Sequence, residues 1–304
     1  MDRTDVTLCM LLLGNSRTPY QELANKLDLS VNAVHKRIKA LVDARIIRAF
    51  TARLSLLALE AVTVWIFGRS TANSSDLHTR LQKHRSTYWV AYSGGGYMYV
   101  GGYLREMSEL EGYIDFVKRE AQLEDPIVGI LPLPPHRSLE GKLYALDYQI
   151  LKALHRDSRK PASAVAVEVR ASARTVQRRL NRMVKKSLAE LSIEWYPDAS
   201  NDIISLCHVN LTARADRARV QAFLRKAFSV NILYSLGFSN LPELLVLCLW
   251  TNTFRELEDT RERIRKAEGI DSILLNVLQI GYMFDTWRDD ALFEKSKVVA
   301  TRVT

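Results

Sequence analysis

The chain contains an internal repeat, and this repeat constrains its fold more than any other feature of the sequence. Segments that begin at Asp5 and at Asp147 align without a gap at an offset of 142 positions. The identical pairs are Leu12 and Leu154, Ser16 and Ser158, Arg17 and Arg159, Pro19 and Pro161, Ala24 and Ala166, Ser30 and Ser172, Val34 and Val176, and Arg37 and Arg179. The offset persists to Gly95 and Gly237. The sequence therefore predicts two copies of one two-part plan.

The first part of each copy has the pattern of a helix-turn-helix. Ser30 and Ser172 stand where a helix N-cap is wanted, because their hydroxyls can accept from free backbone amides. After each serine, apolar residues recur at i, i+4 and i+7, as a buried helical stripe requires. They are Val34, Ile38 and Leu41 in the first copy and Val176, Leu180 and Met183 in the second. We expect each of these helices to be the recognition helix of its copy.

The outward face of each expected recognition helix is polar and basic. It carries Asn32, His35, Lys36 and Lys39 in the first copy, and Arg174, Gln177, Arg178, Asn181 and Arg182 in the second. Arg, Asn and Gln can form bidentate hydrogen bonds with base edges, and Lys and Arg neutralise phosphates. Residues 170–186 include no acid, whereas a solvated structural helix normally mixes charges. The pattern favours double-stranded DNA as the partner. The cap serines, Ser30 and Ser172, are expected to belong to the same DNA-binding surface.

A β-hairpin wing is expected after each recognition helix, over residues 46–53 and 188–195. Only the first wing is basic, through Arg48 and Arg53, which we expect to contact phosphates. The second carries Glu190 and Glu194.

Arg37 and Arg179 flank the buried stripes, and two roles are open for them. They either contact phosphates or pair with the first-helix acids Asp5 and Asp147.

The second part of each copy has the order βαββαβ, which is typical of a ferredoxin-like domain with an antiparallel sheet. In the first copy the expected elements are 62–67, 74–84, 88–92, 97–103, 107–121 and 127–131. In the second they are 203–211, 216–228, 232–236, 244–250, 253–267 and 273–280. The fold class is thus α+β, with two winged helix-turn-helix domains alternating with two ferredoxin-like domains. The predicted domains are 1–54, 55–135, 143–197 and 198–290, and the Pro-rich stretch 131–142 is the predicted linker.

These features together resemble the Lrp/AsnC family of leucine-responsive, or feast/famine, regulators. The resemblance rests on the helix-turn-helix with its cap serine, the V-x-x-R-[IL]-x-x-[LM] stripe and the βαββαβ domain with a Gly turn. It implies a sequence-specific transcription regulator whose α/β domains pair sheet to sheet. With two copies in one chain, it implies an intramolecular pseudo-dimer, and a homodimer of two chains is left open.

The resemblance also implies a small effector, such as an amino acid, near the turn between the second and third strands. The corresponding residues are Gly94, Gly95, Gly96 and Tyr97 in the first copy and Gly237, Ser239 and Asn240 in the second. A purely structural role is equally open, because glycines also permit the positive φ of a tight turn.

Composition adds three expectations. The 43 Lys and Arg against 34 Asp and Glu give a net charge of +9, which favours polyanionic partners. Cys9, Cys207 and Cys248 are embedded among apolar residues and are expected in the core rather than in a metal site. The short apolar run at the N-terminus and the lack of a span of about 20 apolar residues indicate a cytoplasmic protein without membrane contact.

No catalytic, metal-binding or cofactor-binding constellation is expected. The six histidines, His35, His78, His84, His136, His155 and His208, are scattered without metal-ligand spacing. The chain is therefore expected not to be an enzyme. Two alternatives remain: an enzyme similar to siroheme decarboxylases, which resemble this family, and an interaction protein that does not bind DNA.

Overall fold

The computed structural model describes residues 1–72, 76–132 and 141–297, which form two compact units. The first, the α/β unit, consists of Met1 and the described residues of Val62–Pro132 and Pro197–Phe284. The second, the helix-turn-helix unit, consists of those of Asp2–Ala61, Leu133–Tyr196 and Asp285–Thr304. Domains that alternate along the sequence are therefore grouped by type. Most of the predicted linker, residues 133–140, lies outside the described residues.

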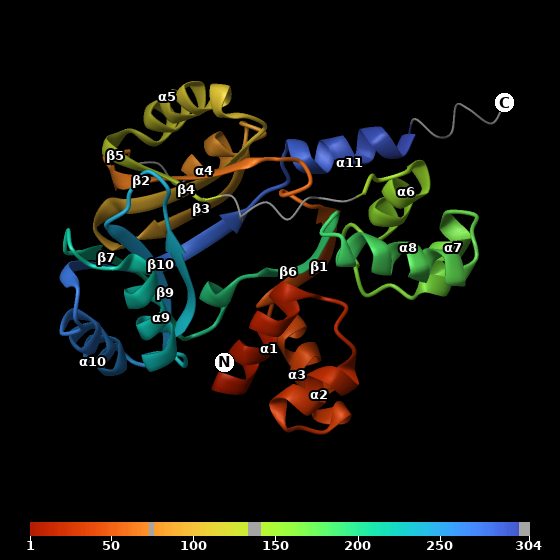
Figure 1. Ribbon diagram of the computed structural model, residues 1–304, viewed down its shortest axis with the longest axis horizontal. Coiled ribbons are helices and arrows are strands. Elements are labelled where there is room, and N and C mark those ends of the chain that lie inside the picture. The colour runs from red at the N-terminus through yellow and green to blue at the C-terminus, as the bar shows by residue number, and fades with distance from the viewer. Residues whose placement is uncertain (73–75, 133–140, 298–304) are drawn as a thin grey trace. The chain divides into compact units, whose positions relative to one another are not determined.

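The helix-turn-helix unit holds two trihelical modules and a C-terminal helix (Figure 1). The first module consists of α1 (Arg3–Gly14), α2 (Tyr20–Leu27), α3 (Val31–Asp43) and strand β1 (Ile47–Leu54). The second consists of α6 (Ala145–Ala153), α7 (Ala162–Glu168), α8 (Ala173–Lys185) and strand β6 (Ala189–Trp195). The two modules are related by an approximate twofold, since Ser16 and Ser158 meet at 2.5 Å through their hydroxyls.

The prediction of two hairpin wings is wrong. Each wing segment is a single strand, and β1 and β6 pair with one another as a two-stranded antiparallel sheet. The register runs from Ile47 opposite Trp195 to Leu54 opposite Ala189. Each copy supplies the backbone partner that its own sequence lacks, so the wing is shared between the modules.

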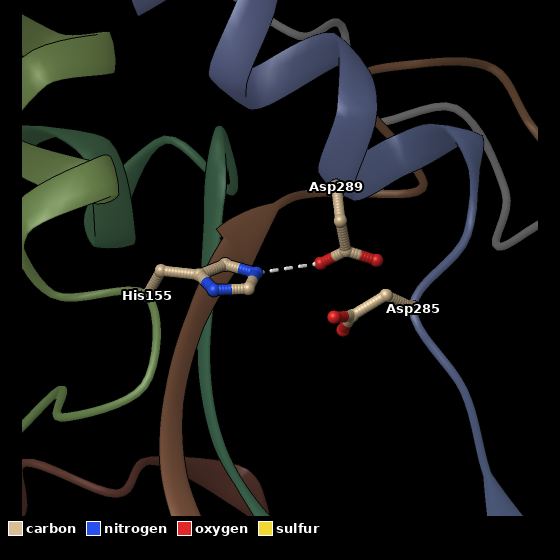
Figure 2. Close-up of side chains that lie close together, drawn as sticks. All are labelled: His155, Asp285 and Asp289. Carbon is tan, nitrogen blue, oxygen red and sulfur yellow. Dashed lines mark hydrogen bonds and ion pairs between the residues drawn. The ribbon is translucent and has the colours of Figure 1, made fainter.

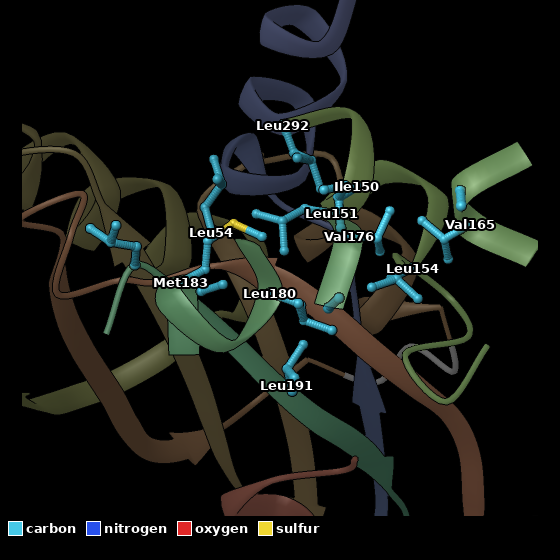
Figure 3. Close-up of a cluster of buried hydrophobic side chains, with 14 residues drawn as sticks. Leu54, Ile150, Leu151, Leu154, Val165, Val176, Leu180, Met183, Leu191 and Leu292 are labelled. Atoms are coloured by element: carbon cyan, nitrogen blue, oxygen red, sulfur yellow. The ribbon is translucent and has the colours of Figure 1, made fainter. Parts of the chain in front are cut away.

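The C-terminal helix α11 (Trp287–Lys297) completes the core of the second module. Its residue Leu292 is fully buried among Ile150, Leu151 and Leu54 (Figure 3). Because Leu54 belongs to β1, this core joins parts of both modules with the C-terminal helix. The predicted last domain, 198–290, ends within this helix.

The α/β unit confirms the order βαββαβ in both copies. In the first copy the elements are β2 (Val62–Ser70), α4 (Leu77–Leu81), β3 (Thr87–Ser93), β4 (Tyr97–Leu104), α5 (Leu110–Ala121) and β5 (Leu123–Ile130). In the second they are β7 (Ile203–Leu211), α9 (Arg217–Ala227), β8 (Ile232–Gly237), β9 (Leu244–Thr251), α10 (Phe254–Arg265) and β10 (Ile270–Met283). Of the helix expected over 74–84, residues 74 and 75 lie outside the described residues.

All eight strands form one sheet in the order β5-β2-β4-β3-β10-β7-β9-β8 (Figure 1). Strand β10 is longer than expected because it has two partners: its first half pairs with β7 and its end with β3. Strand β5 begins before the expected Ile127, although Pro126 lies within it, because it is an edge strand that pairs only with β2.

The two α/β domains pair within the chain, as the tandem arrangement implies. The backbone N–H of Ser239, just after edge strand β8, donates to Ile130 O of the opposite edge strand β5 at 2.8 Å. The faces turned away from the helices meet through aromatic rings, with Phe67 5.0 Å from the His208 ring and 6.0 Å from that of Phe238. Each sheet half therefore covers the other.

The three cysteines, Cys9, Cys207 and Cys248, are buried and free, as expected. Within the described part of the chain, the structure has no helix with the length and apolarity that crossing a membrane requires.

Candidate nucleic-acid interface

The two recognition helices begin as their sequences predict. The Ser30 hydroxyl accepts from the backbone N–H of Ala33 at 3.1 Å, and that of Ser172 accepts from Thr175 at the same distance. The apolar stripes of both helices are buried: Val34, Ile38 and Leu41 in α3, and Val176, Leu180 and Met183 in α8. The opposite face of each helix is therefore left for solvent or a partner.

The outward face of α3 exposes four predicted site residues: Asn32, His35, Lys36 and Lys39. Lys39 forms an ion pair with Asp43 at 2.7 Å. The His35 ring lies 5.5 Å from the ring of Tyr20 on α2. One acid thus offsets part of the positive charge of this face.

The outward face of α8 is more strongly basic. Arg174, Gln177, Arg178 and Asn181 are exposed, and the Gln177 side chain donates to that of Asn181 at 2.8 Å. Among the described residues, neither Arg174 nor Arg178 forms an ion pair with an acid. These two guanidinium groups are therefore available to phosphates and base edges.

The arginines beside the buried stripes are held by acids. Arg37 lies 2.7 Å from both Asp5 and Asp2. The hydrogen bond to Asp5, followed in size by that to Asp2, raises the pKa of Arg37. In the second module the fully buried Asp147 holds Arg179 at 3.1 Å and Arg182 at 2.5 Å. The sequence left two roles open for Arg37 and Arg179, and the geometry favours pairing with first-helix acids. Arg182 is paired with an acid in the same way.

The two basic wing residues differ in their surroundings. Arg48 is exposed, and its guanidinium lies 3.5 Å from the centre of the Tyr196 ring. Arg53 is enclosed by Glu194 at 2.9 Å, Asp289 at 3.1 Å and Asp285 at 3.4 Å. The acids of the shared wing and of the start of α11 thus neutralise Arg53 inside the unit.

His155, Asp285 and Asp289 form a cluster with ligand atoms within 4.8 Å of one another (Figure 2). The His155 Nε2 atom lies 2.8 Å from Asp289. Burial alone would raise the pKa of Asp289, but the hydrogen bond with His155 and the charge of Arg53 hold it well below its usual range. Because Arg53 and Arg156 already occupy these carboxylates, the cluster is an ion network that fixes α11 rather than a good metal site.

The first glycine turn borders a pocket of about 400 Å³ in the α/β unit. Gly95 and Gly96 have φ of 69° and 73°, so this turn requires glycine. With Tyr97 they line the pocket, which Ser70, Tyr92 and Gln279 complete. Gly94 lies in the same turn. Sequence analysis missed Gln279 because it comes from β10 of the other copy.

At the second predicted effector turn, the chain's own side chains and backbone form the contacts. The Asn240 side chain donates to Val128 O at 2.7 Å and accepts from the backbone N–H of Ile130 at 2.8 Å. Arg217 donates to Phe238 O at 2.7 Å, next to Gly237. Ser239 and Asn240 therefore close the sheet here, and the two turns are not equivalent.

Comparison with known proteins identifies both helix-turn-helix modules. The family of winged helix-turn-helix DNA-binding domains matches residues 1–48, and the AsnC-type helix-turn-helix domain matches residues 145–184. The resemblance to Lrp/AsnC regulators is thereby confirmed for the second module, and the first belongs to the broader winged helix-turn-helix class.

Curated relatives match short stretches of the chain. The HTH-type transcriptional regulator LrpA of Pyrococcus horikoshii is 38% identical over 71 residues, which are 23% of this chain and 50% of that protein. The HTH-type transcriptional regulator LysM of Sulfurisphaera tokodaii is 39% identical over 51 residues, 17% of this chain and 36% of that protein. The chain thus spans half or less of the length of these relatives.

One solved structure shares the fold over nearly the whole chain. The siroheme decarboxylase NirDL has a TM-score of 0.58 at 12% identity and covers 98% of this chain and 99% of its own. Its complex with an iron-uroporphyrin III analogue has a TM-score of 0.60, also at 12% identity, and covers 98% of each chain. At this identity the likeness shows a common fold and no more.

Proposed function

We propose that this protein is a sequence-specific DNA-binding transcription regulator of the Lrp/AsnC type, in which α8 is the principal DNA anchor. The observation that carries the proposal is the exposed face of α8, which presents Arg174, Gln177 and Arg178 within a segment, residues 170–186, that contains no acid. The match of this segment to an AsnC-type module supports it.

The N-terminal turn of α8 suits the major groove. The positive end of the helix dipole and the Arg174 guanidinium attract phosphate, while Gln177 and Arg178 reach base edges. On α3, Asn32, His35 and Lys36 play the corresponding part with less charge. Two unlike helices in one chain predict an operator with two unlike half-sites.

The acid-bound arginines support the recognition helices rather than contact phosphate. Arg37, Arg179 and Arg182 tie α3 and α8 to the first helix of their own modules. Arg53 fixes the shared wing and α11. The exposed Arg48 remains a phosphate ligand in this proposal.

The pocket lined by Gly95 and Gly96 is the proposed effector site, and each chain has one such site in this proposal. Its volume of about 400 Å³ lies in the lower part of the range for small-molecule sites, which suits a ligand of amino-acid size. The Ser70 and Ser93 hydroxyls already donate to Ala121 O and Tyr97 O, so of these side chains the amide of Gln279 is the donor that the pocket offers a ligand. The corresponding second turn is filled by Asn240.

The test is a gel-shift selection of genomic DNA fragments by the purified chain at two salt concentrations, followed by sequencing. We expect one motif with two unlike halves. Arg178→Ala should weaken binding about tenfold and reduce the dependence of log K on log salt by about one. The controls Lys83→Ala and Lys118→Ala change exposed lysines of the α/β unit and should have little effect. Equal losses in all three variants, or no salt-dependent binding at all, would contradict the proposal and favour an interaction protein.

Catalysis is the second candidate, favoured by the fold that NirDL shares over 98% of the chain. The pocket at the first turn, with its volume of about 400 Å³, suits ligands smaller than a tetrapyrrole. Incubation of the chain with siroheme and measurement of decarboxylated product separates the two candidates. Turnover without DNA affinity would replace the regulator proposal.

A further inference from the structure

A second pocket lies in the helix-turn-helix unit, away from the glycine turn. It has a volume of about 570 Å³, and part of its wall is the outward face of α8. The lining residues are Asn15, Arg17, Pro19, Gln177, Leu180, Asn181, Val184, Lys185 and Leu191. This volume falls within the range of small-ligand sites.

The internal repeat shows what fills the equivalent space in the other half of the unit. Arg159, the counterpart of Arg17, lies between two aromatic rings of the first module. Its guanidinium is 4.3 Å from the centre of the Tyr20 ring and 5.7 Å from that of Phe50. The counterparts of these rings, at the offset of 142, are Ala162 and Ser192. The space beside Arg17 is open, and the two positions that carry rings in the other half carry small side chains here.

Arg17 is held as firmly as its counterpart. It donates to the carbonyls of Ser158 and Lys160, as Arg159 does to those of Ser16 and Thr18. Burial and the charge of Arg159 lower the pKa of Arg17. Arg17 is thus fixed at the edge of the pocket, where an aromatic ring can stack on its guanidinium.

The charge of the pocket also differs from that of its counterpart. Lys185 stands where the first module has Asp43, and Asn15 stands where the second has Asp157. None of the lining residues, all in the described part of the chain, is acidic. The Gln177 hydrogen bond uses the side-chain oxygen of Asn181, so the Asn181 amide nitrogen is the group that can donate to an anion.

We infer that this pocket binds a small molecule with an aromatic ring and an anionic group, such as an aromatic carboxylate. The ring stacks on Arg17 where Tyr20 and Phe50 stack on Arg159, and the anionic group lies between Lys185 and Asn181. If the proposed function holds, the bound ligand occupies Gln177 and Asn181 and competes with DNA. The binding site itself does not depend on that function.

The test uses 4-hydroxyphenylacetate, which joins the phenol ring of tyrosine to a carboxylate. Titration of the full chain without DNA, followed by calorimetry and ligand-observed NMR, should show one site with about millimolar or tighter affinity. Ala162→Tyr restores the missing ring and should abolish binding. Ser163→Tyr adds the same side chain at the next position, which is exposed, and should leave binding intact.

A second variant separates charge from shape. Lys185→Met should weaken 4-hydroxyphenylacetate about tenfold and leave the neutral ring compound p-cresol unchanged. Absence of binding by the folded wild-type chain, or binding that neither Ala162→Tyr nor Lys185→Met alters, would overturn the inference. A gel shift tests separately whether the ligand releases DNA from the chain. If the chain binds the ligand but has no affinity for DNA, the proposed function is refuted and the pocket is not.

Discussion

The two recognition helices share a scaffold and differ in the face that they present. Both α3 and α8 begin at a serine cap and bury the same three-residue stripe. Both carry an arginine bound to an acid of the first helix of their module, Arg37 to Asp5 and Arg179 to Asp147. After duplication, the residues that set the position of each helix have stayed alike.

The outward faces have diverged in charge. In α3 the exposed Lys39 is paired with Asp43, whereas α8 has Lys185 in place of that acid and leaves Arg174 and Arg178 exposed. Positive charge supplies affinity for any DNA, while polar contacts to base edges distinguish sequences. If the proposed function holds, this difference predicts a division of labour, with α8 as the main source of affinity and α3 as the helix that adds discrimination.

The largest expected effect comes from the acids that hold the helices. Asp147 is fully buried and binds two arginines, so Asp147→Asn leaves their charges poorly compensated and should cost about 3 kcal/mol of folding stability. Asp5→Asn should cost about 1 kcal/mol, because Asp5 is partly exposed and Asp2 still holds Arg37. Calorimetric unfolding of the full chain measures both. Equal losses would show that the two scaffolds are equivalent.

The second effect concerns the facing sheet surfaces of the α/β unit. The first copy presents Trp65 and Phe67 there, and the second presents His208, which is buried and 2.7 Å from the Tyr99 hydroxyl. Burial lowers the pKa of His208 to about 4. The unfolded chain takes up a proton at this histidine near pH 6.5, whereas the folded chain resists it down to about pH 4. Acidification across this window therefore favours unfolding.

Between pH 7.5 and pH 5 this histidine should remove about 2 kcal/mol from the stability of the α/β unit. His208→Gln is neutral at every pH and can still bond to Tyr99, so its stability should fall less over the same interval. Urea unfolding at the two pH values gives the comparison. An identical fall in wild type and variant would assign the acid sensitivity to other groups.

The sequence predicted the elements whose pattern is local. Ser30 and Ser172 as caps, the two stripes and the order βαββαβ all follow from spacing within one copy, and the structure confirms them. Which of the outward residues contact DNA stays a prediction.

What the sequence did not reveal depends on pairing between the copies. The shared wing needs β1 beside β6, and nothing in residues 46–53 alone distinguishes a hairpin from half of a shared sheet. Arg53 is a residue type that binds phosphate, so the sequence suggested a phosphate ligand. Its actual partners, Asp285 and Asp289, follow it by more than 230 positions. The pocket at the first turn likewise takes Gln279 from the other copy.

The smallest effect tests the division of labour most directly. Asp43→Lys frees Lys39 and gives α3 the lysine that α8 has at this position, while Lys185→Asp gives α8 the aspartate of α3. We expect the first change to strengthen DNA binding about threefold and the second to weaken it by a similar factor, since each shifts the salt-dependent term. Gel shifts at two salt concentrations measure both.

The chain that carries both substitutions is the matched control, because its net charge equals that of the wild type. If affinity depends only on net charge, the double variant binds like the wild type with the same motif. If the helices have separate tasks, the double variant keeps its overall affinity but changes the relative enrichment of the two half-sites. Equal enrichment in the double variant and the wild type would refute the division of labour between α3 and α8.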